Sequence, residues 1–266
     1  MPPRRVHLGK YLKTAEMAFA GHFSDGPLVL LDYLMRALRV VILLALWRMV
    51  LSGRGDVSGM SLGAILTYTL IAEVFAPQLD VTTGIENTMW EGTLAMRFLQ
   101  PMGMVANFTS ELLGNWAIGF LTFALPLLLV APLLGVDPRP ASLASGALFA
   151  LSLGVAVAIG IAVDFIFCGI AGNFSQNIWM IKHIRAGLAT ILAGALLPLQ
   201  LLPWGLGDVF AWLPFASMAS APLRLYTGTG DPAFLIPIQL FWCAALWPVA
   251  TWIWTVNREK LAFHGG

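Results

Sequence analysis

Long apolar stretches separated by short polar segments run through almost the whole chain. A helix needs about 20 mainly apolar residues to cross the hydrocarbon core of a bilayer. The pattern predicts six transmembrane helices, at residues 28–51, 61–83, 110–135, 142–168, from near 187 toward the prolines at 198 and 203, and 233–255. We therefore expect an all-α, polytopic membrane protein with one transmembrane domain over 1–266, in which the six spans occupy 28–255 and a cytoplasmic tail occupies 256–266.

Polar positions are frequent in the segment before the first span. Residues 8–23 mix Leu12 with Lys10 and Lys13, which makes the segment too polar to span a membrane. An amphipathic helix that lies in the inner interface and extends its lysines toward lipid headgroups fits this pattern. We predict such a helix within the N-terminal region 1–26, and a plain polar tail is the alternative. No short apolar run with a small-residue cleavage site follows the basic N-terminus, so no removable signal peptide is expected.

The composition agrees with a membrane protein and excludes other classes. Only 11% of the residues are charged and 58% are hydrophobic, and the mean hydropathy is +0.80. Soluble domains carry about 25% charged residues, and disordered chains have low hydrophobicity. The net charge of +1 provides no basic field for nucleic acid, so no nucleic-acid partner is expected.

The basic residues set the expected orientation, because Lys and Arg accumulate in cytoplasmic segments. With the N-terminus inside, the inner segments hold nine of them: Arg4, Arg5, Lys10, Lys13, Arg97, Lys182, Arg185, Arg258 and Lys260. The outer loops hold three: Arg54, Arg139 and Arg224. This asymmetry predicts that both termini lie in the cytoplasm, as an even number of spans requires.

The most polar interior segment lies between the second and third predicted spans, at residues 84–105. Four polar side chains cluster on one side of a helical projection: Glu86, Thr93, Arg97 and Gln100. Leu94 and Phe98 lie beside them, and Glu91 interrupts the apolar face. We predict one short, half-apolar helix on the cytoplasmic side, stopped by Pro101. Its apolar side requires either a partner protein or the membrane surface.

Prolines and glycines interrupt the apolar segment 197–222. No single helix can run through it, yet it is too apolar for a free loop. We predict short helices that dip into the outer leaflet and return, packed against the spans or lining an exit, because broken backbone at membrane depth needs cover by protein or water. The candidate exit or gate residues here are Leu202, Pro203, Trp204, Trp212, Pro214 and Phe215.

The fourth span carries small residues at a spacing of four. They are Ser142, Gly146, Ala150, Gly154, Ala158 and Ala162. Such rows let helices approach closely in lipid. The row predicts either packing within the chain or a dimer seam through Gly146, Ala150, Gly154 and Ala158.

Charged residues inside the spans are functional candidates, because burying a charge in a bilayer is costly. Glu73 lies near mid-depth of the second span and is either a substrate contact or an arginine-paired structural carboxylate. Arg36 and Arg39 lie in the inner half of the first span, and we expect Asp80 and Asp164 to be their partners.

The sequence contains no zinc-protease motif and no nucleotide-binding motif. Neither HExxH nor GxxxxGK[ST] occurs in it. Cys168 and Cys243 have no ligand-spaced neighbours and are expected to be buried free thiols, so no metal site is predicted. We expect that the chain is not an enzyme by itself, and that any ATP it uses is bound by another chain.

Two motifs connect these features to a known family. Residues 92–102 (Gly-Thr-Leu-Ala-Met-Arg-Phe-Leu-Gln-Pro-Met) look like a Gly-x-Leu…Leu-Arg-Pro-Leu coupling segment. Residues 198–204 (Pro-Leu-Gln-Leu-Leu-Pro-Trp), followed by 212–215 (Trp-Leu-Pro-Phe) and Pro222, look like an outer-face signature of the same family. With an interfacial helix before six spans, the chain resembles the permease subunits of ABC-2 type ATP-binding cassette exporters.

This resemblance implies a set of partners and site residues. A separate ABC ATPase, in two copies, would carry ATP and magnesium, and this chain would carry no cofactor. The ATPase-coupling residues would be Glu91, Gly92, Leu94, Arg97, Phe98, Leu99 and Pro101. A second permease half, identical or paralogous, would complete a pathway for a hydrophobic small molecule, drug or lipid-linked compound out of a bacterial cell across its inner membrane. Membrane lipids are further partners.

Two other classes remain open at the level of sequence. A secondary transporter coupled to ions or protons would use Glu73 as its site. Inverted internal repeats would favour that class, and we see none. A membrane scaffold without transport activity is the third class.

Overall fold

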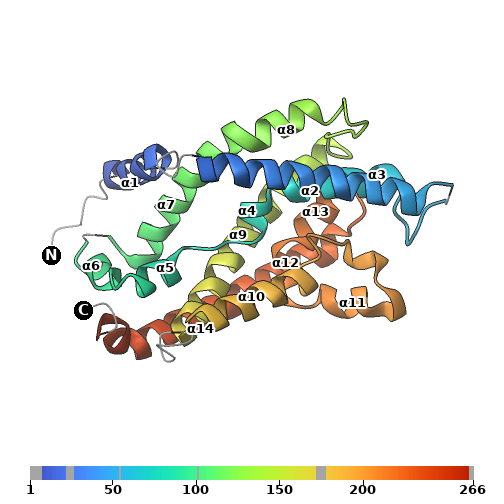
Figure 1. Cartoon of the computed structure of the whole chain (residues 1–266). Coiled ribbons are helices and arrows are strands. Elements are labelled where there is room, and N and C mark those ends of the chain that lie inside the picture. The colour runs from blue at the N-terminus through green and yellow to red at the C-terminus, as the bar shows by residue number, and fades with distance from the viewer. Residues whose placement is uncertain (1–7, 22–26, 54, 101, 172–177, 264–266) are drawn as a thin grey trace.

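The computed structural model of the protein describes residues 8–21, 27–53, 55–100, 102–171 and 178–263. Within these ranges the regular elements are helices, apart from one isolated bridge between Val57 and Met60. The helices form one elongated bundle (Figure 1). The helix α1 (Leu8–Gly21) lies at one end with the short helices α5 (Ile85–Trp90) and α6 (Leu94–Phe98), and α11 (Leu206–Ala211) lies at the other end.

Three helical segments are long and apolar enough to cross a membrane within the described residues. They are Met104–Val130, Leu143–Ala171 and Pro232–Val256. The first combines α7 (Met104–Gly119), the π-helical turn η2 (Phe120–Ala124) and α8 (Leu125–Val130). The second is α9 (Leu143–Ala171), and the third belongs to α14 (Pro232–Phe263). These segments coincide with the third, fourth and sixth predicted spans.

The other three predicted spans also contain helices, but these helices are more polar or shorter. The helix α2 (Pro27–Leu51) has 25 residues and carries Asp32, Arg36, Arg39 and Arg48. The helix α3 (Leu62–Val74) has 13 residues, and α10 (Ile178–Leu192) has 15. Six helical segments therefore follow the order of the six predicted spans, and three of them meet both requirements for crossing a membrane.

The second predicted span ends nine residues earlier than the sequence pattern indicates. The helix α3 stops at Val74, and α4 (Ala76–Leu79) follows after Phe75, whose backbone is not helical. Pro77 has no N–H, so it cannot donate to the carbonyl of Glu73 as helix continuation would require. That carbonyl instead accepts a hydrogen bond from Arg36, with a nitrogen–oxygen distance of 3.0 Å.

The third and fifth predicted spans also begin at different positions. The helix α7 begins at Met104 rather than at 110, because its polar residues Asn107 and Glu111 face hydrogen-bonding partners on α6. The helix α10 begins at Ile178, nine residues before the expected start near 187, and it ends before Pro198. The basic residues of α10 are paired within the bundle, so the helix includes them and remains packed against its neighbours.

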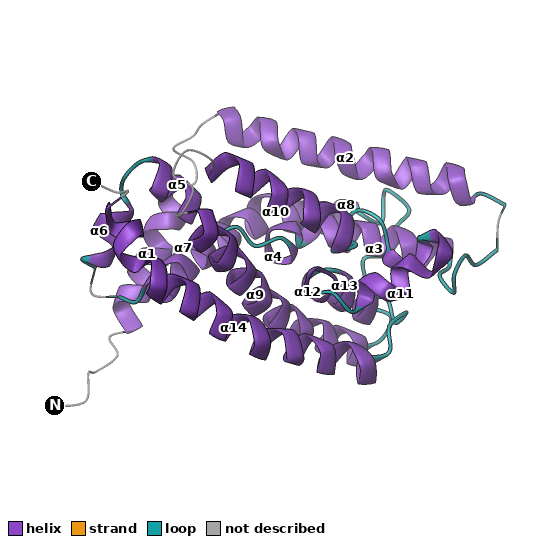
Figure 2. Ribbon diagram, turned by 90° about the horizontal axis from the view of Figure 1, so that it is seen from below, coloured by secondary structure: helices purple, strands orange, loops and turns teal. Residues whose placement is uncertain are grey.

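The helix α9 lies at the centre of the bundle and packs against α10, α14, α12 (Pro214–Met218) and α13 (Ser220–Tyr226). Figure 2 shows α2 and α14 along opposite edges of the bundle. One apolar core joins α2, α3, α9 and α12 through residues such as Leu44, Tyr68 and Met218. A second core joins α5, α6, α7, α9 and α14 through residues such as Leu94 and Phe108. The second core gives the short helices α5 and α6 a fixed base.

Candidate functional site

The segment predicted as one coupling helix folds as two helices. Gly92, between α5 and α6, has a φ of 69°, in the left-handed region that favours glycine. The expectation of a single helix over this segment is therefore wrong, because the chain turns at Gly92 to bury two separate apolar faces. Pro101, the predicted stop, lies outside the described residues.

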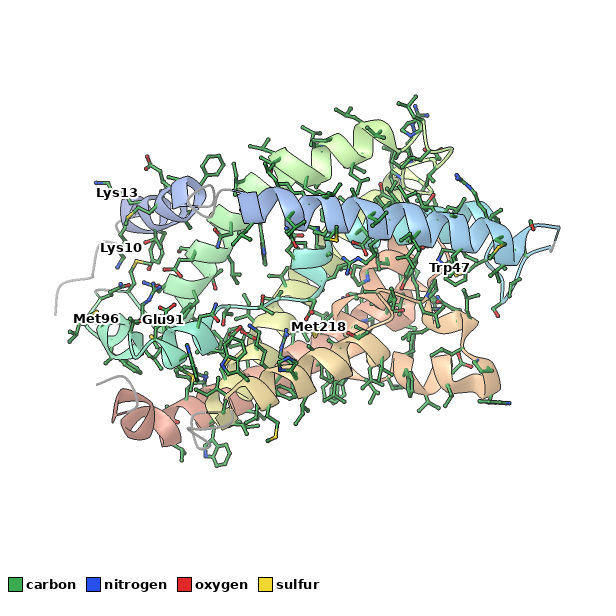
Figure 3. The ribbon with its side chains drawn as sticks, viewed as in Figure 1. Lys10, Lys13, Trp47, Glu91, Met96 and Met218 are labelled. Carbon is green, nitrogen blue, oxygen red and sulfur yellow. The ribbon has the colours of Figure 1, made fainter. Side chains whose placement is uncertain are left out.

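The side chains of the coupling segment divide into buried and exposed groups. Leu94 is 1% exposed and lies in the second core, so its side chain anchors α6 rather than presenting a contact surface. Phe98 is half-buried against the same core. Trp90, Met96 and Leu99 are exposed, with Leu99 at 86%. Glu91 is exposed too. Figure 3 shows Glu91 and Met96 at the end of the bundle where α1 lies.

Arg97 attaches α6 to α7. Its guanidinium forms a salt bridge with Glu111 and donates to the side-chain oxygen of Asn107 at 2.7 Å. The amide of Asn107 in turn donates to Gln100. The guanidinium also lies over the ring of Phe108, 5.3 Å from its centre. The polar face foreseen for this segment therefore exists around Arg97 and Gln100, and it is directed at α7.

Glu86 attaches α5 to α10 instead of joining that polar face. Its carboxylate lies 2.8 Å from the ammonium of Lys182. Next to this pair, the rings of Trp90 and Trp179 meet edge to face with centroids 6.0 Å apart. The coupling segment is therefore held by charge on two sides, at α7 and at α10.

Arg185 of α10 is the centre of a buried polar cluster behind α5. Its guanidinium lies 3.2 Å from Asp164 of α9 and 3.1 Å from Asp80, and it donates to the carbonyl of Val81. Thr83 donates to Asp164 through both its backbone N–H and its hydroxyl. A buried ion pair needs such additional hydrogen bonds to offset its desolvation. Arg185 thereby joins α9, α10 and the chain that leads into α5.

This cluster corrects one expectation from the sequence. Asp80 and Asp164 pair with Arg185, not with Arg36 and Arg39. The burial of Arg185 was not predicted from the sequence. The available signal was its spacing of three residues from Lys182, which places both side chains on one face of a helix.

The same region brings potential ligand atoms of Glu86, Asp164 and Cys168 within 4.8 Å of one another. Lys182 and Arg185 already neutralise the two carboxylates. The adjoining cavity measures only about 20 Å³. These neighbours disfavour a metal cation at this cluster.

Glu73 lies in the other half of the bundle and is arginine-paired. Its carboxylate is buried and receives a hydrogen bond from Arg39 of α2 at 2.6 Å. Arg36 binds the Glu73 backbone carbonyl and lies 4.1 Å from the ring centre of Phe123. Of the two interpretations left open by the sequence, this geometry favours the structural carboxylate.

The interrupted segment after α10 packs along α9 and α14 at the end opposite α6. It contains the short helices η3 (Leu199–Leu201), η4 (Pro203–Gly205), α11, α12 and α13. Gln239 of α14 donates to the carbonyl of Ser217 at 2.8 Å and accepts from Ser152 of α9. Trp242 donates to the carbonyl of Trp212 at 2.8 Å. Two backbone carbonyls of the interrupted segment are thus satisfied by side chains of α14.

The predicted gate residues differ in exposure. Phe215 is buried, and Leu202 and Pro214 are half-buried. Pro203, Trp204 and Trp212 are exposed. Trp204 is 91% exposed and has a φ of 59°, an uncommon backbone conformation for a bulky residue. The exposed members form the surface of this end of the protein, and the buried ones hold it to the bundle.

The small-residue row on α9 is only partly used for packing within the chain. Ala150 and Gly154 are exposed, and a Cβ added at Gly154 would meet no atom within 4 Å. Ala158 is half-buried, and Gly146 packs on Pro140. The tight approaches of α9 to the rest of the chain lie outside the row, at Gly169, where an added Cβ would lie 2.5 Å from Ile253, and at Gly160, where it would lie 2.7 Å from Val81.

Comparison with known proteins assigns the chain to a family. The model of the family described as ABC-2 family transporter protein matches residues 37–265, which is most of the chain. No curated protein and no solved structure matches it. The matched range includes the coupling segment, the Arg185 cluster and the interrupted segment after α10. The chain therefore belongs to the ABC-2 transporter family, as a membrane permease subunit that associates with a separate ABC ATPase.

Proposed function

We propose that this permease forms half of an exporter that moves a hydrophobic small molecule, drug or lipid-linked compound out of a bacterial cell. Two permease halves, identical or paralogous, form the pathway at their interface by alternating access. Two copies of the ATPase bind below them and close on ATP. The distribution of basic residues supports cytoplasmic termini at the inner membrane.

One observation carries the proposal: the coupling segment is exposed on one side and clamped on the other. Trp90, Met96 and Leu99 present apolar surface. Behind them, Arg97–Glu111 joins the segment to α7 and Glu86–Lys182 joins it to α10. A force applied to the exposed side chains therefore reaches α7 and α10 through charged contacts with defined geometry.

The Arg185 cluster extends this connection toward the membrane. Because Arg185 holds Asp164 of α9 and Asp80 of the chain before α5, movement of α5 displaces α9 and α10 together. We infer that ATP-driven closure of the ATPases reaches the pathway by this route. Trp204 and Trp212, exposed at the opposite end, are the proposed outer gate.

The proton-coupled alternative has less support. Glu73 would have to release Arg39 in order to exchange a proton freely, and the family match associates the chain with an ATPase.

The test compares two leucines of equal exposure. Leu99 on the coupling segment and Leu133 in the loop after α8 are both 86% exposed. The full chain, or its Leu99→Asp or Leu133→Asp variant, is co-expressed with its partner ABC ATPase. We expect Leu99→Asp to reduce ATPase co-purification about tenfold, as loss of a central apolar contact does, and to abolish ATP-dependent extrusion of hydrophobic dyes.

The Leu133→Asp variant is expected to retain both properties. Equal ATPase capture by the two variants would exclude the exposed side of the coupling segment as the contact. Capture without ATP-dependent extrusion of any dye in the panel would contradict the proposed export function.

A further inference from the structure

Three neighbouring cavities surround the contact of α1 with α7. The largest measures about 810 Å³, within the size range of ligand sites. Its wall is almost entirely apolar and combines α1, α6, α7, α9 and α14 through residues that include Tyr11, Phe98, Val105, Phe165, Trp247 and Trp254. A second apolar cavity of about 410 Å³ shares Tyr11, Ser110 and Leu113 with the first. The two apolar spaces therefore lie next to each other along α1 and α7.

The third cavity has a different chemical character. It measures about 730 Å³ and shares Arg97 and Met102 with the largest one. Its charged lining residues are Lys10, Lys13, Arg97 and Glu111, three positive and one negative, which leaves an excess of two positive charges. Glu111 is engaged by Arg97. Lys10 and Lys13 of α1 supply two of the three positive charges, and amides of Gln100, Asn107 and Asn115 also line the cavity.

The position of α1 is fixed by tight packing, so the cavities have defined walls. A Cβ added at Gly114 of α7 would collide with the backbone carbonyl of Ala15 in α1, so the two helices approach more closely than any larger residue would permit. The hydroxyl of Thr14 reaches Met102 in the chain between α6 and α7. Figure 3 shows Lys10 and Lys13 on α1, at the same end of the bundle as Met96 of α6.

Two neighbouring apolar cavities beside a basic one match an amphiphile with two acyl chains and an anionic head. We propose that this chain binds one anionic glycerophospholipid of the membrane at α1. The acyl chains occupy the 810 Å³ and 410 Å³ cavities, and the phosphate lies at Lys10 and Lys13. Basic side chains at the membrane surface attract anionic lipids in this way.

A membrane phospholipid fits these observations better than a transported hydrophobic compound. A neutral compound would use the apolar cavities but would gain nothing from the basic lining of the third cavity. The site is also complete within one chain and lies along α14, at the edge of the bundle opposite α2 (Figure 2). The bound lipid would contact Arg97 and Phe98 of α6, which, on the proposed function, makes coupling depend on anionic lipid.

The test measures binding to the full chain alone, without ATPase or cargo, so its outcome is separate from that of the proposed function. Delipidated protein is titrated with phosphatidylglycerol or phosphatidylcholine of identical acyl chains, and bound lipid is counted by native mass spectrometry. We expect one phosphatidylglycerol per chain, bound at least tenfold more tightly than phosphatidylcholine.

Variants assign the headgroup and the chains separately. The Lys10→Gln/Lys13→Gln double variant should lose the preference for phosphatidylglycerol. The Lys10→Arg/Lys13→Arg variant should retain it, as should Arg139→Gln, which removes an exposed positive charge from the loop between α8 and α9. Ala106→Phe, which fills the largest cavity, should weaken binding of both lipids.

Circular dichroism and the thermal midpoint establish that each variant is folded. The proposal is overturned if the unchanged protein binds the two lipids equally or binds neither of them. It is also overturned if the folded Lys10→Gln/Lys13→Gln variant keeps the preference for phosphatidylglycerol.

Discussion

The guanidinium of Arg185 on α10 lies 3.2 Å from the carboxylate of Asp164 on α9, and both side chains are almost fully buried. Neither charge can return to water while the bundle is closed. Each therefore depends on the other and on the contacts that Asp80, Val81 and Thr83 contribute. This pair makes the base of the coupling segment a single polar unit rather than a set of surface contacts.

Removal of either partner should be strongly destabilising. Arg185→Gln leaves the Asp164 charge buried without its main partner, and we expect a loss of about 3 kcal/mol in the free energy of unfolding. Asp164→Asn should have a similar effect. The double variant should lose less than the sum, because it leaves no isolated charge. Unfolding by SDS titration measures all three, with exposed Arg139→Gln as a control expected within about 0.5 kcal/mol. Additive losses would contradict the pairing.

Leu94 and Leu99 lie five residues apart, and truncating them should change the stability of the protein by very different amounts. Leu94 is 1% exposed in the second core, so Leu94→Ala should reduce the free energy of unfolding by about 3 kcal/mol. Leu99 is 86% exposed, so Leu99→Ala should change it by less than about 0.5 kcal/mol. Chemical unfolding of the two variants in the same detergent compares them directly. Equal losses of stability in the two variants would contradict the position of α6 in the structure.

Glu73→Gln distinguishes a structural carboxylate from a proton site. The variant loses the ion pair with Arg39, whose side chain is half-exposed, so the expected loss of stability is about 1 kcal/mol or less. ATP-dependent extrusion of hydrophobic dyes should persist at neutral pH with little change in rate. Two results would instead support proton coupling through this residue. One is the loss of transport in a folded Glu73→Gln protein. The other is a transport rate that depends on the pH gradient in the unchanged protein but not in the variant.

The apolar pattern predicts the order of the helices well but says little about what the charged residues do. Runs of apolar residues must be helical in a bilayer, and prolines interrupt them, so the broken segment 197–222 is visible in the sequence. Arg185 is different. The sequence pattern around a charged residue between apolar runs is the same whether its charge is solvated by water or paired with a buried carboxylate. The carboxylate that pairs with Arg185 belongs to Asp164, which is remote in sequence. The burial of Leu94 likewise depends on α7 and α9, which the local pattern around Gly92 does not contain.

Two glycines on α9, six residues apart, test which face of this helix is packed within the chain. A Cβ at Gly160 would lie 2.7 Å from Val81, which is fully buried and accepts a hydrogen bond from Arg185. Gly160→Ala should therefore cost about 1–2 kcal/mol through overpacking. A Cβ at Gly154 would meet nothing within 4 Å, so Gly154→Ala should be neutral or stabilising by up to about 1 kcal/mol, because alanine is the better helix former.

Gly154 also tests the predicted dimer seam. Gly154→Leu should leave the folded subunit intact but reduce the fraction of paired permease halves, because a large side chain prevents the close approach that small residues permit. Cross-linking in native membranes and mass photometry after extraction measure that fraction. Unchanged pairing in Gly154→Leu would exclude this row as the contact between halves, and a stability loss equal to that of Gly160→Ala would show that α9 packs through its other face.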